Sequence, residues 1–260
     1  LEIGTEELPA NFSHSVINQI KSLIKFEFDK KLIKYDSFTC TSTPRRIVLF
    51  IEGLVDYSDD KTVIRKGPNV AFAFLNGVPT NAAKGFANSL GINIKDLEIK
   101  NTEKGDFVFG KKIEKGESTK SSLSSIIPKL IKNFQGPRFM KWGYGSFKFS
   151  RPIRWVVSLY NDEILNFVFD GCDPKISIGN TSRGHRLFNN DIEINSPDNY
   201  FELMAKSGVL VKRKERKEKI LDLITQESKL LNLNPDLSDD LLNELTDLVE
   251  SPNLIKGNFD

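Results

Sequence analysis

The sequence is poor in the residues that form covalent and metal cross-links. Its 260 residues include two cysteines, Cys40 and Cys172, and two histidines, His14 and His185. Two cysteines cannot form a disulfide framework, and there is no C-x-x-C pair to favour a zinc site. Low cysteine usage is typical of a reducing compartment, so we expect a cytoplasmic protein.

Long hydrophobic runs and a charge excess are missing too. No apolar stretch approaches the ~20 residues that a helix needs to span a bilayer, so we expect no membrane association. Thirty-seven Lys and Arg offset thirty-five Asp and Glu, giving a formal net charge of +2. The chain is not a polycation, and any contact with nucleic acid must come from local basic patches. The hydrophobic fraction of 39% is enough to bury a core and excludes a disordered chain.

Motifs for self-contained catalysis are absent or incomplete. The segment 105–112 (GDFVFGKK) comes close to a P-loop, but Lys112 stands where Ser or Thr would hold magnesium, and the intervening residues alternate as in a strand. Neither histidine is followed by Asp, and no G-x-S-x-G nucleophile elbow is present. Glu2, Glu6 and Glu7 form an acidic cluster, for which we expect a surface or helix-capping role. We therefore predict no complete active site in this sequence.

Hydrophobic periodicity predicts an α+β fold: a body of mixed or antiparallel sheet with packed helices over 1–195, followed by a mainly helical segment over 196–260. Strands are expected over 1–4, 37–41, 47–55, 107–113, 153–160 and 164–169, with a hairpin turn at 161–162. Helices are expected from Pro9, over 80–89, over 120–134 with a kink or break at Pro128, and over 200–206, 209–231 and 237–249. Because both ends fall within ordered sequence, we expect a piece of a longer polypeptide.

Basic residues concentrate in the stretch 131–154, which holds six of them and no acid, interleaved with six aromatic residues. Cations beside flat side chains suit RNA, because phosphates attract positive charge and unpaired bases stack on aromatic rings. The alternative is a core strand pair whose solvent face is basic, and the sequence leaves both open. Residues 206–219 carry seven basic residues, a pattern that favours a solvated helix face over a phosphate-facing one.

Six groups of segments stand out in order along the chain: 2–9 (EIGTEELP), 43–46 (TPRR), 65–68 (RKGP), 140–143 with 149–155 (MKWG and FSRPIRW), 182–186 (SRGHR), and 242–252 with 257–260 (LNELTDLVESP and GNFD). In order and spacing they resemble landmarks of the β subunit of bacterial-type glycyl-tRNA synthetase. Six collinear motifs that cover the whole chain are highly specific together. Two departures are mild: Ser251 stands where the family often has Trp, and Lys141 where it often has Arg.

This resemblance implies a division of labour between two subunits. In that family the α subunit carries the class II catalytic core that makes glycyl-adenylate from glycine and ATP with Mg²⁺. The longer β subunit supplies tRNA binding, and the enzyme is α2β2. The chain would then be the N-terminal part of β, with the α subunit and tRNA(Gly) as partners, no cofactor of its own, and no activity when isolated. A bacterial cytoplasm and a plastid stroma would both suit it.

The motifs and the charge pattern together nominate eleven residues for tRNA or partner binding: Arg45, Arg46, Arg65, Lys66, Arg138, Lys141, Arg151, Arg154, Arg183, His185 and Arg186. The alternative is that these arginines brace the fold by pairing with carboxylates or carbonyl groups. Two other functions also stay open. The chain could be a docking module that holds α while RNA binds elsewhere, or a free-standing RNA-binding protein of the same ancestry.

Overall fold

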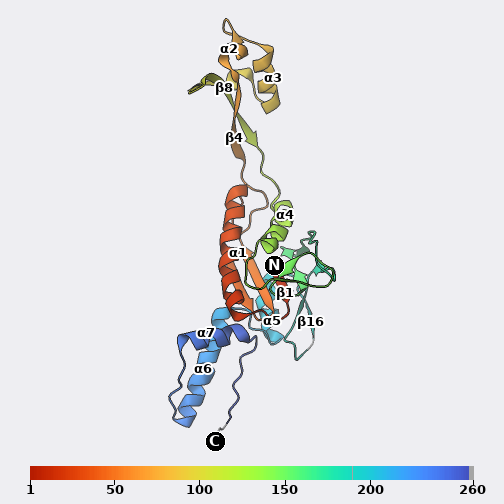
Figure 1. Cartoon of the computed structure of the whole chain (residues 1–260), viewed down its shortest axis with the longest axis vertical. Coiled ribbons are helices and arrows are strands. Elements are labelled where there is room, and N and C mark those ends of the chain that lie inside the picture. The colour runs from red at the N-terminus through yellow and green to blue at the C-terminus, as the bar shows by residue number, and fades with distance from the viewer. Residues whose placement is uncertain (189, 258–260) are drawn as a thin grey trace. The chain divides into compact units, whose positions relative to one another are not determined.

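The computed structural model describes residues 1–188 and 190–257 (Figure 1). Contacts between Cα atoms divide them into two compact units. The body unit comprises residues 1–30, 35–56 and the described residues from 119 onward, and the insertion unit comprises 31–34 and 57–118. The division expected from the sequence, near residue 195, stays a prediction. Helices combined with mainly antiparallel sheets confirm the expected α+β class.

A five-stranded sheet lies at the centre of the body unit. Its strands are β1 (Glu2–Thr5), β2 (Ser37–Thr43), β3 (Arg46–Glu52), β11 (Ile153–Val157) and β14 (Ile178–Gly179). The strand order is β14-β11-β1-β3-β2, and all neighbours are antiparallel except β11 and β14, which are parallel. β1 is therefore the middle strand, and all four of its residues are buried.

Two neighbouring residues of β2 show what covers each face of this sheet, because side chains alternate between faces along a strand. The Ser42 hydroxyl donates to the carbonyl of Ser13 in helix α1 (Ala10–Lys31) at 2.9 Å, so one face packs on α1. The Thr41 hydroxyl donates to the carbonyl of Val211 at 2.8 Å, so the opposite face packs on a later part of the chain. The apolar stripe of α1 is buried, as its periodicity predicts.

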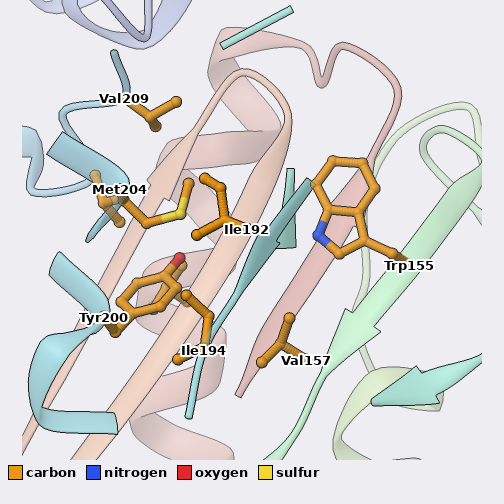
Figure 2. Close-up of a cluster of buried hydrophobic side chains, with 9 residues drawn as sticks. Trp155, Val157, Ile192, Ile194, Tyr200, Met204 and Val209 are labelled. Atoms are coloured by element: carbon orange, nitrogen blue, oxygen red, sulfur yellow. The ribbon is translucent and has the colours of Figure 1, made fainter. Parts of the chain in front are cut away.

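A hydrophobic cluster covers that second face. In Figure 2, Trp155 of β11 lies across the cluster from Tyr200 and Met204 of helix α5 (Tyr200–Lys206). The hairpin of β15 (Thr181–Arg183) and β16 (Asp191–Glu193) contributes Ile192 between them. The buried members of the cluster are Val48, Trp155, Val157, Ile192, Ile194, Tyr200, Met204, Val209 and Val211.

Helix α4 (Thr119–Lys132) continues past Pro128, so the break allowed for in the sequence does not occur. Proline removes one helical hydrogen bond, but buried residues on both sides of it, including Ile126 and Leu130, keep the helix packed on the core. The expected hairpin turn is confirmed: β12 (Leu159–Tyr160) pairs with β13 (Glu163–Ile164). No helix in the described part of the chain is long and apolar enough to cross a membrane.

The last part of the body unit is helical, as its sequence pattern predicts. Helices α6 (Arg213–Leu231) and α7 (Asp239–Leu248) pack on each other and on β2. Arg216 of α6 is completely buried and donates hydrogen bonds to four carbonyls, those of Leu210, Val211, Thr246 and Ser42, at 2.6–3.2 Å. Burial lowers the pKa of Arg216 to about 10, and the guanidinium stays charged at neutral pH. This one side chain therefore ties α6 and α7 to the sheet.

The insertion unit is a three-stranded antiparallel sheet with two helices. Its elements are β4 (Lys61–Asn69), α2 (Val70–Ala73), β5 (Phe74–Leu75), β6 (Val78–Pro79), α3 (Asn81–Leu90), the 3₁₀ turn Ile94–Asp96, β7 (Glu98–Thr102) and β8 (Gly105–Glu114). The order is β4-β8-β7, so β8 is the central strand. α3 ends at Leu90 and is capped by Gly91, whose φ of 67° is the left-handed conformation expected just after a helix C-terminus. The segment that resembles a P-loop is therefore strand β8, as its alternation predicts.

Candidate functional site

Arg46, the first residue of β3, is completely buried in the body unit. Its Nε lies 3.0 Å from Oε1 of Glu250, and its Nη1 lies 3.7 Å from Oε1 of Glu2. Nη1 also donates to the carbonyl of Arg183 at 2.9 Å. Burial alone lowers the pKa of Arg46, but the two carboxylates raise it above its ordinary value, so the guanidinium stays charged. Arg46 thus braces the fold, which is the alternative that the sequence left open.

Glu2 connects this ion-pair network to three hydrogen-bond donors. Its carboxylate accepts from the indole N–H of Trp155, from the Ser182 hydroxyl at 2.7 Å, and from the Tyr200 hydroxyl. Burial and the charge of Glu2 raise the pKa of Tyr200 well above its ordinary value, so the phenol stays protonated and can donate. Glu2 itself is only 1% exposed, so the surface or capping role expected for it is wrong.

The ring of Trp155 joins the buried network to the molecular surface. The guanidinium carbon of Arg183 lies 4.8 Å from the ring centroid and that of Arg45 lies 5.8 Å from it, both within cation–π distance. Gly4 of β1 packs against the same ring, and a Cβ added there would lie 1.8 Å from a ring atom. Only glycine therefore allows β1 and the indole to approach so closely.

Two adjoining cavities open on this side of the body unit, and we call their lining the arginine rim. The first, of about 560 Å³, is lined by Glu6, Glu7, Arg45, Arg151 and Arg186. The second, of about 280 Å³, shares Glu6 and is lined also by Ile153, Arg154, Pro174, Lys175, Ile176 and Arg183. Six cations thus face two carboxylates.

Only part of that positive charge is neutralised within the rim. Nε of Arg154 lies 2.6 Å from Oε1 of Glu6, and Arg186 pairs with Glu7. Among the described residues, no carboxylate forms an ion pair with Arg45, Arg151 or Arg183. Guanidinium groups that face a cavity without a carboxylate partner are suited to binding oxyanions, phosphates above all.

Comparison with known proteins identifies the family. The family model described as "Glycyl-tRNA synthetase beta subunit" matches residues 1–260. The chain belongs to this family. It is 42% identical to the glycine–tRNA ligase beta subunit of Trichodesmium erythraeum over 261 residues, which cover 100% of the chain and 36% of that protein.

Other β subunits give the same result. The chain is 39% identical to the one from Halothermothrix orenii and 36% identical to the one from Clostridioides difficile. Each match covers 100% of the chain and 37% of the relative. The chain therefore spans little more than a third of the length of these relatives.

Five of the six groups of β-subunit motifs meet at or beside the rim. The segment 2–9 supplies Glu2, Glu6 and Glu7, the segment 43–46 supplies Arg45 and Arg46, and the segment 149–155 supplies Arg151, Arg154 and Trp155. The segment 182–186 contributes Arg183 and Arg186, and Glu250 comes from the segment 242–252. The one remaining group, 65–68, lies in the insertion unit. Residues 258–260 of the last motif lie outside the described residues.

The remaining nominated residues do not line the rim. Arg138 and Lys141 are exposed, and Lys141 belongs to the short strand β9 (Met140–Lys141). His185 is half-buried, and its ring packs 5.8 Å from that of Phe188. Arg65 and Lys66 lie on β4 of the insertion unit and are exposed.

The stretch 131–154 matches the second alternative that its sequence left open, with aromatic side chains in the core and a basic solvent face, and its binding of RNA stays a prediction. Most of its aromatic side chains pack among themselves in the core: the Phe149 ring lies 5.5–6.3 Å from the rings of Phe12, Phe134, Phe139 and Phe147. Its basic side chains are exposed except Arg151, which is half-buried. The aromatic half of the pattern is therefore structural, and the cationic half faces solvent.

Several contributors to the site were not nominated from the sequence. Tyr200 and Lys175 lie outside the motifs, and Glu6 and Glu7 were assigned a surface or capping role. Their partners are distant along the chain: Arg154 is 148 residues from Glu6, and Arg186 is 179 residues from Glu7. No local pattern can reveal pairs at such separations. The only available signal was that these acids and arginines belong to motifs of one family.

Proposed function

We propose that the chain is the N-terminal part of the β subunit of a glycine–tRNA ligase, which attaches glycine to tRNA(Gly) with ATP, and that it binds tRNA rather than forming the adenylate. Its support is the family match over the whole chain, joined to a rim in which six cations face two carboxylates. ATP and Mg²⁺ would be used through the α subunit of an α2β2 complex in the cytoplasm.

The observation that carries the tRNA-binding role is the set of arginines without carboxylate partners. Arg45, Arg151 and Arg183 line cavities of about 560 and 280 Å³, and guanidinium groups are forked donors that suit phosphate. One nitrogen of Arg151 already donates to the carbonyl of Ser150 at 2.9 Å, which leaves its other donors for a ligand. A phosphate at the rim would also compete with Glu6 and Glu7 for Arg154 and Arg186. Folded RNA is held largely by contacts to phosphate and sugar, and an arginine rim suits such contacts.

The test is the affinity of the chain for tRNA(Gly), measured over a series of salt concentrations. The Arg151→Gln and Arg186→Gln variants should each weaken binding and reduce the slope of log affinity against log salt by roughly one, the loss of one phosphate contact. Lys25→Gln, which removes an exposed lysine of α1 in the same unit, is the matched control. Variants with the affinity and slope of this control would refute the role of the rim.

The rim also has an apolar neighbour that favours a second candidate function, docking of the α subunit. Leu187 and Phe188 directly follow Arg186 and are 80% and 64% exposed. Exposed apolar side chains beside charged ones are typical of protein interfaces. Mixing the chain with α in the absence of RNA separates the two functions. If Leu187→Ser abolishes complex formation with α, docking is supported. If the same variant keeps its affinity for tRNA, the RNA-binding role stays with the arginines.

A further inference from the structure

The sheet of the insertion unit has one face covered by helices and one face that is not. Val108 of the central strand β8 is completely buried with Ala73 of α2 and Ala83 of α3. Because side chains alternate along a strand, Phe107 and Phe109 point to the opposite face. Both phenylalanines are only partly buried.

The register shows which side chains surround the two rings. Residues paired directly across antiparallel strands lie on the same face. Lys66 of β4 pairs with Phe109, and Lys100 of β7 pairs with Phe107. Nζ of Lys66 lies 3.4 Å from the centroid of the Phe107 ring, and Nζ of Lys100 lies 5.7 Å from that of Phe109.

The acid on this part of the open face is Glu98, and it forms ion pairs with two lysines. Oε1 of Glu98 lies 2.5 Å from Nζ of Lys111, and Oε2 lies 3.3 Å from Nζ of Lys100. These contacts lower the pKa of Glu98, which therefore stays ionised and neutralises about one lysine. Lys66 has no carboxylate partner among the described residues. The face thus combines two rings on the central strand with a net positive charge.

We propose that this open face binds an unpaired segment of RNA, with two bases stacked on Phe107 and Phe109 and the phosphates held by Lys66 and Lys100. Aromatic rings two residues apart on a central strand, flanked by cations, form a stacking platform for single strands. The proposal rests on the proposed function in that its ligand is RNA. It gives a role to Lys66 of the segment 65–68, which the arginine rim does not use.

The present contacts of the rings are compatible with such binding. A cation over an exposed ring is held less strongly than a base stacked on it, and lysine has a long, flexible side chain. Lys66 can therefore leave the Phe107 ring for a phosphate while a base takes its place. Lysine is depleted at protein–protein interfaces, so the charge around the rings favours RNA over an apolar protein segment.

The experiment measures the affinity of the full chain for a fluorescently labelled single-stranded RNA oligonucleotide by anisotropy. Phe107→Leu and Phe109→Leu keep apolar volume but remove the flat ring, and each should weaken binding on the order of tenfold. Phe72→Leu is the matched control, because Phe72 of α2 is 75% exposed in the same unit but does not belong to the sheet. Thermal unfolding of each variant shows whether it is folded.

A second variant keeps the test decisive should a leucine variant unfold. Phe109→Trp retains an aromatic surface, so it should bind the oligonucleotide as the unaltered chain does, and stacked bases should quench its added fluorescence. Wild-type affinity in both leucine variants, or fluorescence that RNA does not quench, would overturn the proposal. Leucine variants that lose binding to a protein partner but still bind RNA normally would likewise overturn the proposal.

The outcomes for the two surfaces can be told apart. If Arg151→Gln and Arg186→Gln weaken tRNA(Gly) binding while the leucine variants bind single-stranded RNA normally, the arginine rim stands and the stacking face is refuted. If the leucine variants lose binding to single-stranded RNA while the rim variants bind tRNA(Gly) normally, the stacking face stands and the role of the arginine rim is refuted.

Discussion

Replacing Arg46 by methionine is expected to destabilise the body unit strongly. Methionine fills much of the same volume but leaves Glu2 and Glu250, which are 1% and 6% exposed, without their cation. Removing one partner of a buried ion pair costs about 3–5 kcal/mol, because an uncompensated charge stays buried. At about 2–4 °C per kcal/mol for a protein of this size, the midpoint of thermal unfolding should fall by about 6–20 °C.

Tryptophan fluorescence is the right assay for this variant. Both tryptophans of the chain, Trp142 and Trp155, belong to the body unit, so their signal reports the unit that contains Arg46. The neighbouring Arg45→Met is the matched control, since Arg45 is half-buried and makes no ion pair among the described residues, and it should cost less than about 1 kcal/mol. Equal effects of the two substitutions, or a loss below about 1 kcal/mol for Arg46→Met, would refute the bracing role.

Three further changes test other parts of the same core. Gly4→Ala places a methyl group 1.8 Å from a Trp155 ring atom and should cost about 1–3 kcal/mol in urea unfolding; an unchanged midpoint would refute the close packing. Arg216→Met leaves four carbonyls without their donor and should expose α6 and α7 to proteolysis before the sheet; uniform cleavage would contradict this. The pKa of Tyr200 is raised in the folded state, so as pH rises the tyrosine of the unfolded chain ionises first. The contribution of Tyr200 to the free energy of unfolding is therefore present below about pH 10 and is lost as pH rises further. Tyr200→Phe should therefore show a shallower loss of stability between about pH 9 and about pH 11 than the unaltered chain, and parallel curves would refute the assignment.

Local patterns predicted many of the elements because each depends on neighbours in sequence. The stripe of α1, the C-terminal Gly91 of α3 and the turn at Asn161, whose φ is 51°, can all be derived from a few consecutive residues. Pro128 shows the opposite case, because packing on both of its sides overrides the local preference to break the helix.

The candidate site could be predicted only in outline. The sequence nominated the motif arginines as a group but could not separate Arg46, which is buried, from Arg45 beside it, which lines a cavity. That difference depends on Glu250, 204 residues away, and on Glu2, which looked like a surface acid. The insertion unit was also missed, since β4 and β8 pair although residues 70–104 lie between them and carry no sign of a boundary.

The central claim is that the chain binds tRNA while another subunit forms the adenylate. Its most direct test is glycine-dependent exchange of pyrophosphate into ATP, measured on a preparation of the chain already shown to bind tRNA(Gly). We expect no exchange above the level without glycine, because in the proposed division of labour the adenylate forms on the α subunit. Exchange by the purified chain alone would contradict this division of labour.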